Sequence, residues 1–502
     1  MPVPFVNSII SWFLKKRKHQ IELFIKSPND VQQELLSGLI DRAKNTEFGK
    51  QYDYASMKGY VDFAGSVPVQ QYESIEPLIE RCRKGEQHLF WPTPIKWFAK
   101  SSGTTNAKSK FIPVSDEAIE YCHLKAGKDM LCLYINSNED AKLFTGKGLR
   151  LGGSSAIYKD NNSYFGDLSA IIIENMPFWA DFSSAPSQET ALMSEWEAKM
   201  EAIVNETIHE NITSLVGVPS WMLVLLNRVL KKTGKNNILE VWPNLEVYFH
   251  GGVNFSPYRE QYYKLIPKKD FRYYEIYNAS EGFFAIQDRN TSDELLLMLD
   301  YGIFYEFIPM SAYDGENSDA IPLSEVKENI NYAVVITTNS GLWRYLVGDT
   351  VKFTSLRPHR IKITGRTKHF INVFGEELII ENAEEALKQA CKKTNASITD
   401  YTVAPVFMKD DREGGHEWLI EFNETPENMA YFTEALDNAL QAVNSDYKAK
   451  RYQNMTLAMP VIHQAKTGLF YSWLEQKGKL GGQHKVPRLS NKRDFIEELL
   501  RL

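Results

Sequence analysis

Residues 101–110 read Ser-Ser-Gly-Thr-Thr-Asn-Ala-Lys-Ser-Lys, and this run of hydroxyl side chains, one glycine and two lysines governs how the chain is interpreted. Glycine permits backbone angles that let successive N–H groups converge on an anion, hydroxyls donate to phosphate oxygens, and lysine adds positive charge. Residues 95–100 are predicted to form a strand, and a loop that leaves a strand is a usual place for phosphate binding. The Walker spacing is absent. A solvated turn has a similar composition, so the loop alone leaves both interpretations open.

The composition describes an ordinary globular protein with several domains. The chain has 502 residues, of which 43% are hydrophobic and 24% charged, values that indicate neither disorder nor a fibrous repeat. A net charge of -7 argues against nucleic acid as the main partner. The cysteines form no C-x-x-C pair, which predicts a reduced compartment without structural zinc; they are Cys82, Cys122, Cys132 and Cys391.

The N-terminus is apolar over residues 1–14, and a basic run, residues 15–18, follows it. A secretory signal has the opposite order of charge and apolar residues. A helix at a membrane surface is one interpretation, and a helix packed on its own domain is the favoured one. No apolar stretch approaches the length needed to span a bilayer. We therefore expect a cytoplasmic protein without a membrane span.

Helix and strand patterns alternate through most of the chain, which predicts an α/β fold. Asn29 or Asp30 is expected to cap a first helix, because apolar residues recur at helical spacing after them. Further helices are predicted at 187–210, 219–232, 380–394 and 427–443, and strands at 213–217, 245–249, 294–299, 332–337, 401–408 and 417–422. The pattern changes near residues 364–368 to a smaller α+β composition. A domain boundary is expected there.

Four more polar clusters follow apolar segments later in the chain. An aromatic strand precedes Tyr-Asn-Ala-Ser-Glu-Gly at 277–282, where a ring could cover a purine and a carboxylate could hold Mg²⁺. Residues 341–349 end in Gly-Asp, and a carboxylate there could accept both ribose hydroxyls. Gly-Arg at 365–366 precedes Ile-Asn-Val-Phe-Gly-Glu-Glu at 371–377, and paired glycines at 481–488 precede a lysine. A structural turn would explain any one of these clusters alone.

Taken together and in this order, the clusters resemble the motifs of the adenylate-forming superfamily, which includes acyl-CoA synthetases and firefly luciferase. Within that superfamily the chain is most similar to the auxin-responsive Gretchen Hagen family of acyl-acid amido synthetases, in a shorter bacterial-type form. The similarity extends over nearly the whole chain. Ala107 stands where the plant pattern has glycine, and Leu346 where it has arginine.

This resemblance implies a large N-terminal α/β domain of adenylate-forming type, residues 1–366, which binds ATP and the acid. A smaller, mobile C-terminal α+β domain, residues 367–502, would turn about a hinge at Lys368. The implied activity is a ligase that uses ATP and Mg²⁺ to convert a carboxylic acid to an acyl adenylate, then transfers the acyl group to an amino acid. The oligomeric state stays open, with a monomer as one option.

The resemblance also assigns individual residues. Catalysis is expected to depend on Lys485, Glu281 and Lys110, with Glu281 also binding Mg²⁺. ATP is expected to contact Ser101, Ser102, Gly103, Thr104, Thr105, Gly251, Gly252, Tyr277, Asn278, Ala279, Ser280, Asp349 and Arg366. The acyl group is expected to contact Pro219, Trp221, His250, Val253 and Phe255. Ordinary core packing is the alternative for the aromatic members of that last set.

Two other functions share these motifs. An acyl-CoA ligase would use the same adenylation step and pass the acyl group to coenzyme A. A nucleotide-binding protein that has lost turnover would keep the fold, but retention of Glu281, Asp349, Arg366 and Lys485 together argues against it. The sequence names neither the acid nor the acceptor, because pocket shape decides both.

Overall fold

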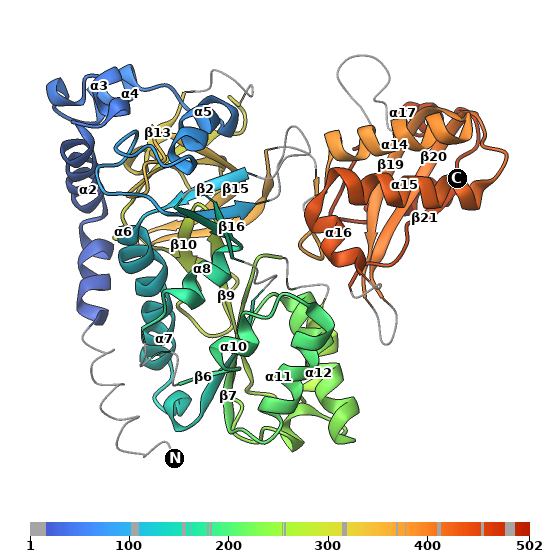
Figure 1. Ribbon diagram of the computed structural model, residues 1–502, viewed down its shortest axis with the longest axis horizontal. Helices are drawn as coiled ribbons and strands as arrows, with labels where there is room; N and C mark the ends of the chain where they lie inside the picture. The colour runs from blue at the N-terminus through green and yellow to red at the C-terminus, as the bar shows by residue number, and fades with distance from the viewer. Residues whose placement is uncertain are drawn as a thin grey trace.

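The protein is described by a computed structural model, and its architecture is α/β as expected. Figure 1 shows a large body that contains the N-terminal three quarters of the chain and a smaller body formed by the C-terminal elements. The structure describes residues 17–101, 110–152, 157–160, 162–177, Ala180, 183–253, Phe255, 258–313, 319–367, 370–376, 378–408, 413–452, 456–476 and 487–502.

A twelve-stranded mixed sheet organises the large body, in the order β13-β12-β14-β15-β16-β11-β10-β9-β8-β7-β3-β6. Its parallel half is β9 (Arg272–Ala279), β8 (Val247–Gly251), β7 (Ile212–Gly217), β3 (Lys147–Leu151) and β6 (Ser184–Ala185). Its antiparallel half is β10 (Gly282–Ile286), β11 (Leu295–Leu297), β16 (His359–Arg366), β15 (Tyr345–Leu356), β14 (Asn331–Thr338), β12 (Ile303–Pro309) and β13 (Ile321–Pro322). Most of these strands are buried because helices and a second sheet cover them.

A four-stranded sheet in the order β2-β1-β5-β4 forms the second layer. Its strands are β1 (Trp97–Ser101), β2 (Lys110–Val114), β4 (Tyr158–Asp160) and β5 (Ser163–Gly166). Strands β1 and β2 are antiparallel, and Ser101 lies opposite Lys110 in their register. The two described ends of the segment 101–110 therefore lie opposite each other in a β-hairpin.

The helices of the large body form where apolar residues recur at helical spacing. The longer ones are α2 (Pro28–Ala43), α5 (Tyr72–Arg83), α7 (Lys125–Ser137), α11 (Trp196–Thr207) and α12 (Pro219–Thr233). Shorter ones include α8 (Leu168–Glu174), α10 (Gln188–Ala191) and α13 (Arg259–Leu265). Within the described ranges, no helix combines the length and apolar character that a membrane crossing requires.

Two predicted helices differ from the structure at their ends. The helix predicted after Asn29 or Asp30 is α2, which follows a helical stretch at residues 17–26 and begins at Pro28 with Ser27 as its N-cap residue, so the predicted caps Asn29 and Asp30 lie inside it. Proline is favoured at the first helical position because its missing N–H needs no partner there. The helix predicted at 187–210 is two helices, α10 and α11, because the Glu195 side chain caps the second one through the amides of Glu197 and Ala198.

The small body consists of a three-stranded sheet and the helices that cover it. Its strands are β19 (Ser397–Val406), β20 (Gly415–Glu424) and β21 (Val461–Gln464), in that order. Its helices are α14 (Ile380–Thr394), α15 (Met429–Val443), α16 (Ser445–Arg451), α17 (Leu469–Gln476) and α18 (Asp494–Leu500). A two-stranded pair, β17 (Phe370–Ile371) and β18 (Leu378–Ile379), connects it to β16.

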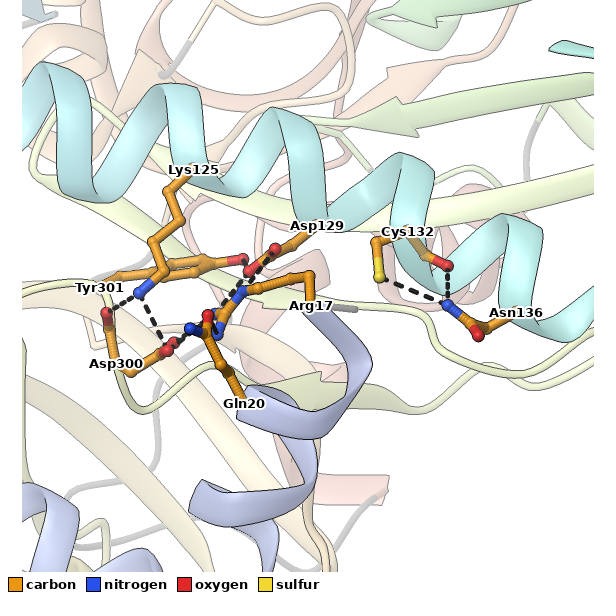
Figure 2. Close-up of polar contacts among 8 residues, drawn as sticks. All are labelled: Arg17, Gln20, Lys125, Asp129, Cys132, Asn136, Asp300 and Tyr301. Atoms are coloured by element: carbon orange, nitrogen blue, oxygen red, sulfur yellow. Dashed lines mark hydrogen bonds and ion pairs between the residues drawn. The ribbon is translucent and has the colours of Figure 1, made fainter. Parts of the chain in front are cut away.

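A partly buried charge network fastens the start of the described chain to the large body (Figure 2). Arg17 donates to both carboxylate oxygens of Asp129 at 2.9 Å and to Asp300 at 2.7 Å. Lys125 donates to Asp300 at 2.9 Å, and the Tyr301 hydroxyl donates to Asp129 at 2.8 Å. Each carboxylate thus has a cation and a second donor, which offsets the cost of removing it from water.

Burial lowers the pKa of three histidines, to about 4 for His123 and His359 and to about 3 for His250. An unfolded histidine takes up its proton near pH 6.5, whereas these folded ones do so only at lower pH. The part of the unfolding free energy that depends on these histidines being neutral is therefore fully present above pH 6.5. It is lost as the pH falls from 6.5 toward 4.

We predict that the free energy of unfolding falls by about 1.4 kcal/mol per pH unit for each such histidine between pH 6 and 5. The measurement is urea unfolding of the wild type and of His359→Gln across that range. Buried carboxyl groups with a raised pKa change the unfolding free energy in the opposite direction, but they do so equally in both proteins. The difference between the two slopes of unfolding free energy against pH therefore isolates the contribution of His359. Equal slopes would contradict the prediction.

Candidate functional site

A cleft of about 610 Å³ opens where the two halves of the large sheet meet the small body. Most of the residues predicted to contact ATP lie along it. They are Ser101, Gly252, Tyr277, Asn278, Ala279, Ser280, Asp349 and Arg366, and the predicted catalytic residues Lys110 and Glu281 and the predicted acyl residue Val253 lie with them. Segments far apart in sequence are thus brought together.

Asp349 is the centre of the hydrogen bonds in this cleft. Its carboxylate accepts from the Tyr277 hydroxyl at 2.8 Å and from the Arg366 guanidinium at 2.8 Å. Asp349 and Arg366 are register partners on the antiparallel strands β15 and β16, which places their side chains next to each other. The carboxylate is held in one orientation from two sides.

Tyr277 is buried, and its ring packs against Phe284 with the ring centroids 4.8 Å apart. Burial, together with the adjacent Asp349 charge, raises the pKa of Tyr277 well above its ordinary value. The phenol is therefore protonated at any physiological pH and acts as a hydrogen-bond donor to Asp349. The sequence predicted contact with adenine, and the structure adds this link to the aspartate.

Ser280 and Glu281 form the turn between β9 and β10, where Ala279 pairs with Gly282. The tight turn places the Glu281 carboxylate at the edge of the cleft. The pKa of the nearby Tyr345 hydroxyl is raised well above its ordinary value, first by burial and then by the charge of Glu281. Glu281 is the acidic group that faces the cleft from this turn.

Lys110 begins β2 and lines the cleft together with Ser101, the last residue of β1. Its ammonium lies 5.3 Å from the centre of the Tyr72 ring. The hydroxyl of Tyr72 accepts the amide N–H of Phe111 at 2.9 Å. This tyrosine therefore supports both the lysine and the strand that carries it.

The two glycines at the end of β8 are required for different reasons. A Cβ on Gly251 would lie 2.4 Å from the carbonyl oxygen of Ile276, because β8 and β9 run side by side there. Gly252 has a φ of +82°, a conformation that side chains disfavour, and it lines the cleft. Strand packing explains the first glycine and backbone conformation the second.

The residues predicted for the acyl group do not share one hollow. Val253 lines the cleft, whereas Trp221 lines a second hollow of about 570 Å³ between the two bodies. His250 and Phe255 line a third one, and the carbonyl of Pro219 accepts from the Tyr262 hydroxyl at 2.7 Å. The predicted set is therefore distributed over neighbouring parts of the large body.

Family models match most of the chain. The GH3 family N-terminal domain matches residues 17–271, the central domain 296–366 and the C-terminal domain 381–494. The chain belongs to the GH3 family. Relatives include the indole-3-acetic acid-amido synthetase GH3.3 of Arabidopsis thaliana, 22% identical over 93% of this chain and 90% of that protein. The jasmonoyl--L-amino acid synthetase JAR6 of Nicotiana attenuata is also 22% identical, over 93% of this chain and 92% of that protein.

Solved structures place the GH3 chain in the adenylate-forming fold. GH3.15 acyl acid amido synthetase superimposes with a TM-score of 0.59 at 17% identity, over 94% of this chain and 93% of that one. A 2-hydroxyisobutyryl-CoA ligase gives a TM-score of 0.59 at 13% identity, over 95% and 92%. The fold is thus the one that the sequence motifs predicted.

The small body contributes cleft residues that were not predicted from the sequence. Asn372, Val373, Phe407, Asn491 and Lys492 line the cleft from that side. Asn372 and Val373 lie in the segment 371–377, which was noted among the sequence motifs. Its position shortly after Arg366 could have predicted that it lies near the cleft. No pattern marked the other three, because they reach the cleft only through the docking of the small body.

Direct contacts join the two bodies beside the cleft. Tyr258 donates to the carbonyl of Val373 at 2.7 Å, and Gln261 donates to the carbonyl of Met408 at 2.6 Å. The Lys450 ammonium lies 4.0 Å from the centre of the Trp221 ring. This packing forms the second hollow, which Ser101 lines as well as the cleft.

Some predicted residues lie outside the described part of the chain. They are Ser102, Gly103, Thr104, Thr105, Lys368 and Lys485. Their predicted roles stay predictions. Ser101 and Lys110, which flank the first four of these residues, and Arg366, two positions before Lys368, line the cleft.

We predict that Gly251→Ala destabilises the protein by about 2 to 4 kcal/mol, because the new methyl group would overlap the Ile276 carbonyl. The measurement is the free energy of unfolding in urea. Gly38→Ala is the matched control: its Cβ on α2 would meet nothing within 4 Å, so a gain of about 0.5 to 1 kcal/mol is expected. Equal effects of the two changes would contradict the packing argument.

Proposed function

We propose that the chain is an ATP-dependent ligase that adenylates a carboxylic acid and transfers the acyl group to an amino acid. The observation that carries the proposal is the cleft in which Asp349, fixed by Tyr277 and Arg366, shares one wall with Ser101, Lys110 and Glu281. Membership of the GH3 family and the names of its relatives support the choice of amide formation.

In the first step a carboxylate oxygen attacks the α-phosphorus of ATP, the bond to the β-phosphate oxygen breaks, and pyrophosphate leaves. In the second, the amine nitrogen attacks the acyl carbon, the bond to AMP breaks, and the amine loses a proton. No protein nucleophile is needed. Because carboxylate and phosphates repel each other, the site must neutralise charge and hold an in-line approach.

Each cleft residue has a proposed task in that chemistry. Asp349 accepts hydrogen bonds from the ribose hydroxyls, using carboxylate lone pairs that are not occupied by the hydrogen bonds from Tyr277 and Arg366. Lys110 and the hydroxyls of residues 101–105 bind the phosphates. Gly252 allows the adenosine to approach the backbone closely. Lys485 on the small body stabilises charge in one of the two steps, with Lys368 as the hinge between the domains 1–366 and 367–502.

Magnesium fits this site as a partner of the nucleotide. Among the described residues no cluster of three metal-ligating side chains occurs, and Mg²⁺ commonly uses one or two carboxylates together with phosphate oxygens and water. Glu281, at the turn that faces the cleft, is the carboxylate proposed to hold it. When bound, the ion would supply positive charge to the triphosphate.

The hollow between the two bodies is proposed to receive the reactants that meet the nucleotide. Its wall includes Trp196 and Trp221, which contact each other with ring centroids 5.8 Å apart. Its rim carries both signs of charge, with Lys100 and Lys448 among the cations and Asp167 among the anions. An apolar acid and a zwitterionic amino acid both match such a lining. Ser101 lines this hollow and the ATP cleft alike, so reactants here would be adjacent to the phosphates.

A screen of pyrophosphate release tests the proposal directly. Purified protein with ATP and Mg²⁺ is offered a panel of carboxylic acids, each with amino acids or coenzyme A, and products are identified by mass spectrometry. We expect release that depends on the acid and an amide that depends on the amino acid. A thioester product with indifference to every amino acid would instead establish an acyl-CoA ligase, and no release with any acid would favour a non-catalytic protein.

We predict that Asp349→Ala raises the Michaelis constant for ATP by tenfold or more, because the ribose contacts are lost and Arg366 loses its buried partner. Tyr277→Phe removes one hydrogen bond to the same carboxylate and should raise the constant by about threefold to tenfold. Lys485→Ala should chiefly slow turnover. Asp41→Asn, which changes an exposed ion pair with Lys44 on the surface, is the control and should leave the kinetics unchanged. Wild-type kinetic constants in all three site variants would refute the proposed geometry.

A further inference from the structure

A third hollow, of about 890 Å³, lies beside the cleft and has no part in the proposed reaction. It is enclosed by the end of β8, helix α13, the segment 266–271 and the segment 287–293 that follows β10. Glu275 and Asp293 line both this hollow and the cleft, so the two are neighbours. We call it the aromatic pocket, because Phe255, Tyr263, Phe271 and Tyr273 line it.

The rings of the aromatic pocket form a connected wall. Tyr273 contacts Phe255, Tyr263 and Phe271 with ring centroids 5.0, 5.7 and 4.9 Å apart. Tyr263 is 44% exposed, which is high for a large aromatic side chain on a folded protein. Such a wall offers flat apolar surface to a planar ligand.

His250 lines this pocket, and one of its two ring nitrogens has no hydrogen-bond partner among the described residues. Its side chain is 3% exposed, its Nδ1 atom is buried, and the described part of the chain supplies that atom with no partner. Burial lowers the pKa of His250 to about 3, so the ring is neutral and offers one donor and one acceptor. A buried polar atom without a partner is costly, and a bound ligand group would satisfy it.

The charges that line the aromatic pocket favour an anion. Two of the charged groups are engaged elsewhere, since Arg272 pairs with Asp140 at 2.8 Å and Asp293 pairs with Lys362 at 2.7 Å. Burial raises the pKa of Glu275 to about 7, which leaves this carboxyl only partly charged at neutral pH. The other cationic residues that line the pocket are Arg259, Lys268 and Lys269, and the other anionic residue is Asp270. Positive charge therefore exceeds negative charge in the lining.

Arg259 is the cation best placed to meet such an anion. It lies on α13, and its guanidinium carbon is 5.5 Å from the centre of the Phe255 ring. A planar guanidinium next to an aromatic ring can bind a carboxylate through two parallel hydrogen bonds while the ligand's ring stacks on the wall.

The pocket is too far from the phosphate end of the cleft for its occupant to react there. Glu275, at the shared border, lies four residue steps before Ala279 on β9, or about 13 Å of extended strand. None of Ser101, Lys110 or Glu281 lines the aromatic pocket. A ligand in this pocket therefore occupies a second site and is not the acid that is adenylated.

We propose that the aromatic pocket binds a planar aromatic carboxylate, with Arg259 on the carboxylate, Phe255 and Tyr273 against the ring, and His250 as a neutral hydrogen-bonding partner. The site works without nucleotide and alongside it. This inference does not depend on the proposed ligase activity.

The test is isothermal titration of the full-length protein with 2-naphthoate in the absence of nucleotide. We expect saturable binding that Arg259→Gln weakens by about tenfold, through loss of the charged hydrogen bonds, and that Phe255→Leu also weakens. Lys232→Gln, an exposed lysine near the end of α12, is the charge-matched control and should bind as the wild type does. Thermal midpoints confirm that each variant is folded.

A second titration, with the cleft saturated by the non-adenylating analogue α,β-methylene-ATP, separates the two sites. We expect 2-naphthoate to bind the saturated protein within twofold of its affinity for the free protein. Competition by the analogue, an unchanged affinity in folded Arg259→Gln, or no binding at millimolar 2-naphthoate would each overturn the proposal. Pyrophosphate release by Arg259→Gln should equal that of the wild type. The binding proposal can therefore be wrong while the ligase proposal holds, and the reverse.

Discussion

The hydrogen bond between Tyr277 and Asp349 is the constraint on which the arrangement of the cleft depends. Three strands, β16, β11 and β10, lie between β15 and β9 in the sheet order. In a flat sheet four strand spacings would separate these strands by about 19 Å, yet the phenol and the carboxylate are 2.8 Å apart. The sheet must therefore curl until its two halves meet, and the cleft lies at that meeting point.

The curled sheet explains why so many separate motifs converge. The turn with Glu281 closes β9 and β10, Gly252 follows β8, and Arg366 ends β16, so each motif stands at the end of a strand. The hairpin of β1 and β2 brings Ser101 and Lys110 to the same opening. Polar residues at strand ends can be exposed to a ligand while the strands themselves stay buried, which is how a rigid core supports a polar site.

The small body completes the site from the other side. Its contacts through Val373, Met408 and Lys450 lie beside the hollow that Trp221 lines, and its residues Asn372 and Val373 line the cleft. The interface combines hydrogen bonds to backbone carbonyls with one cation–π contact. Beside these contacts, Phe255 and Tyr258 of the large body and Val373 and Phe374 of the C-terminal segment belong to one buried hydrophobic cluster, so apolar packing also positions the small body.

The α/β class, most helices and strands, and the family could all be predicted from the amino-acid sequence, because apolar periodicity and the order of the polar clusters can be read along the chain. It also predicted many of the large-body residues that line the cleft, since the motifs that contain them are short and contiguous. Three features came only from the folded structure: Tyr277 binds Asp349, His250 and Phe255 line a different hollow from Trp221, and Asn491 and Lys492 reach the cleft. Those facts depend on how the sheet curls and how the small body docks, and both are set by contacts between residues that lie far apart in the sequence.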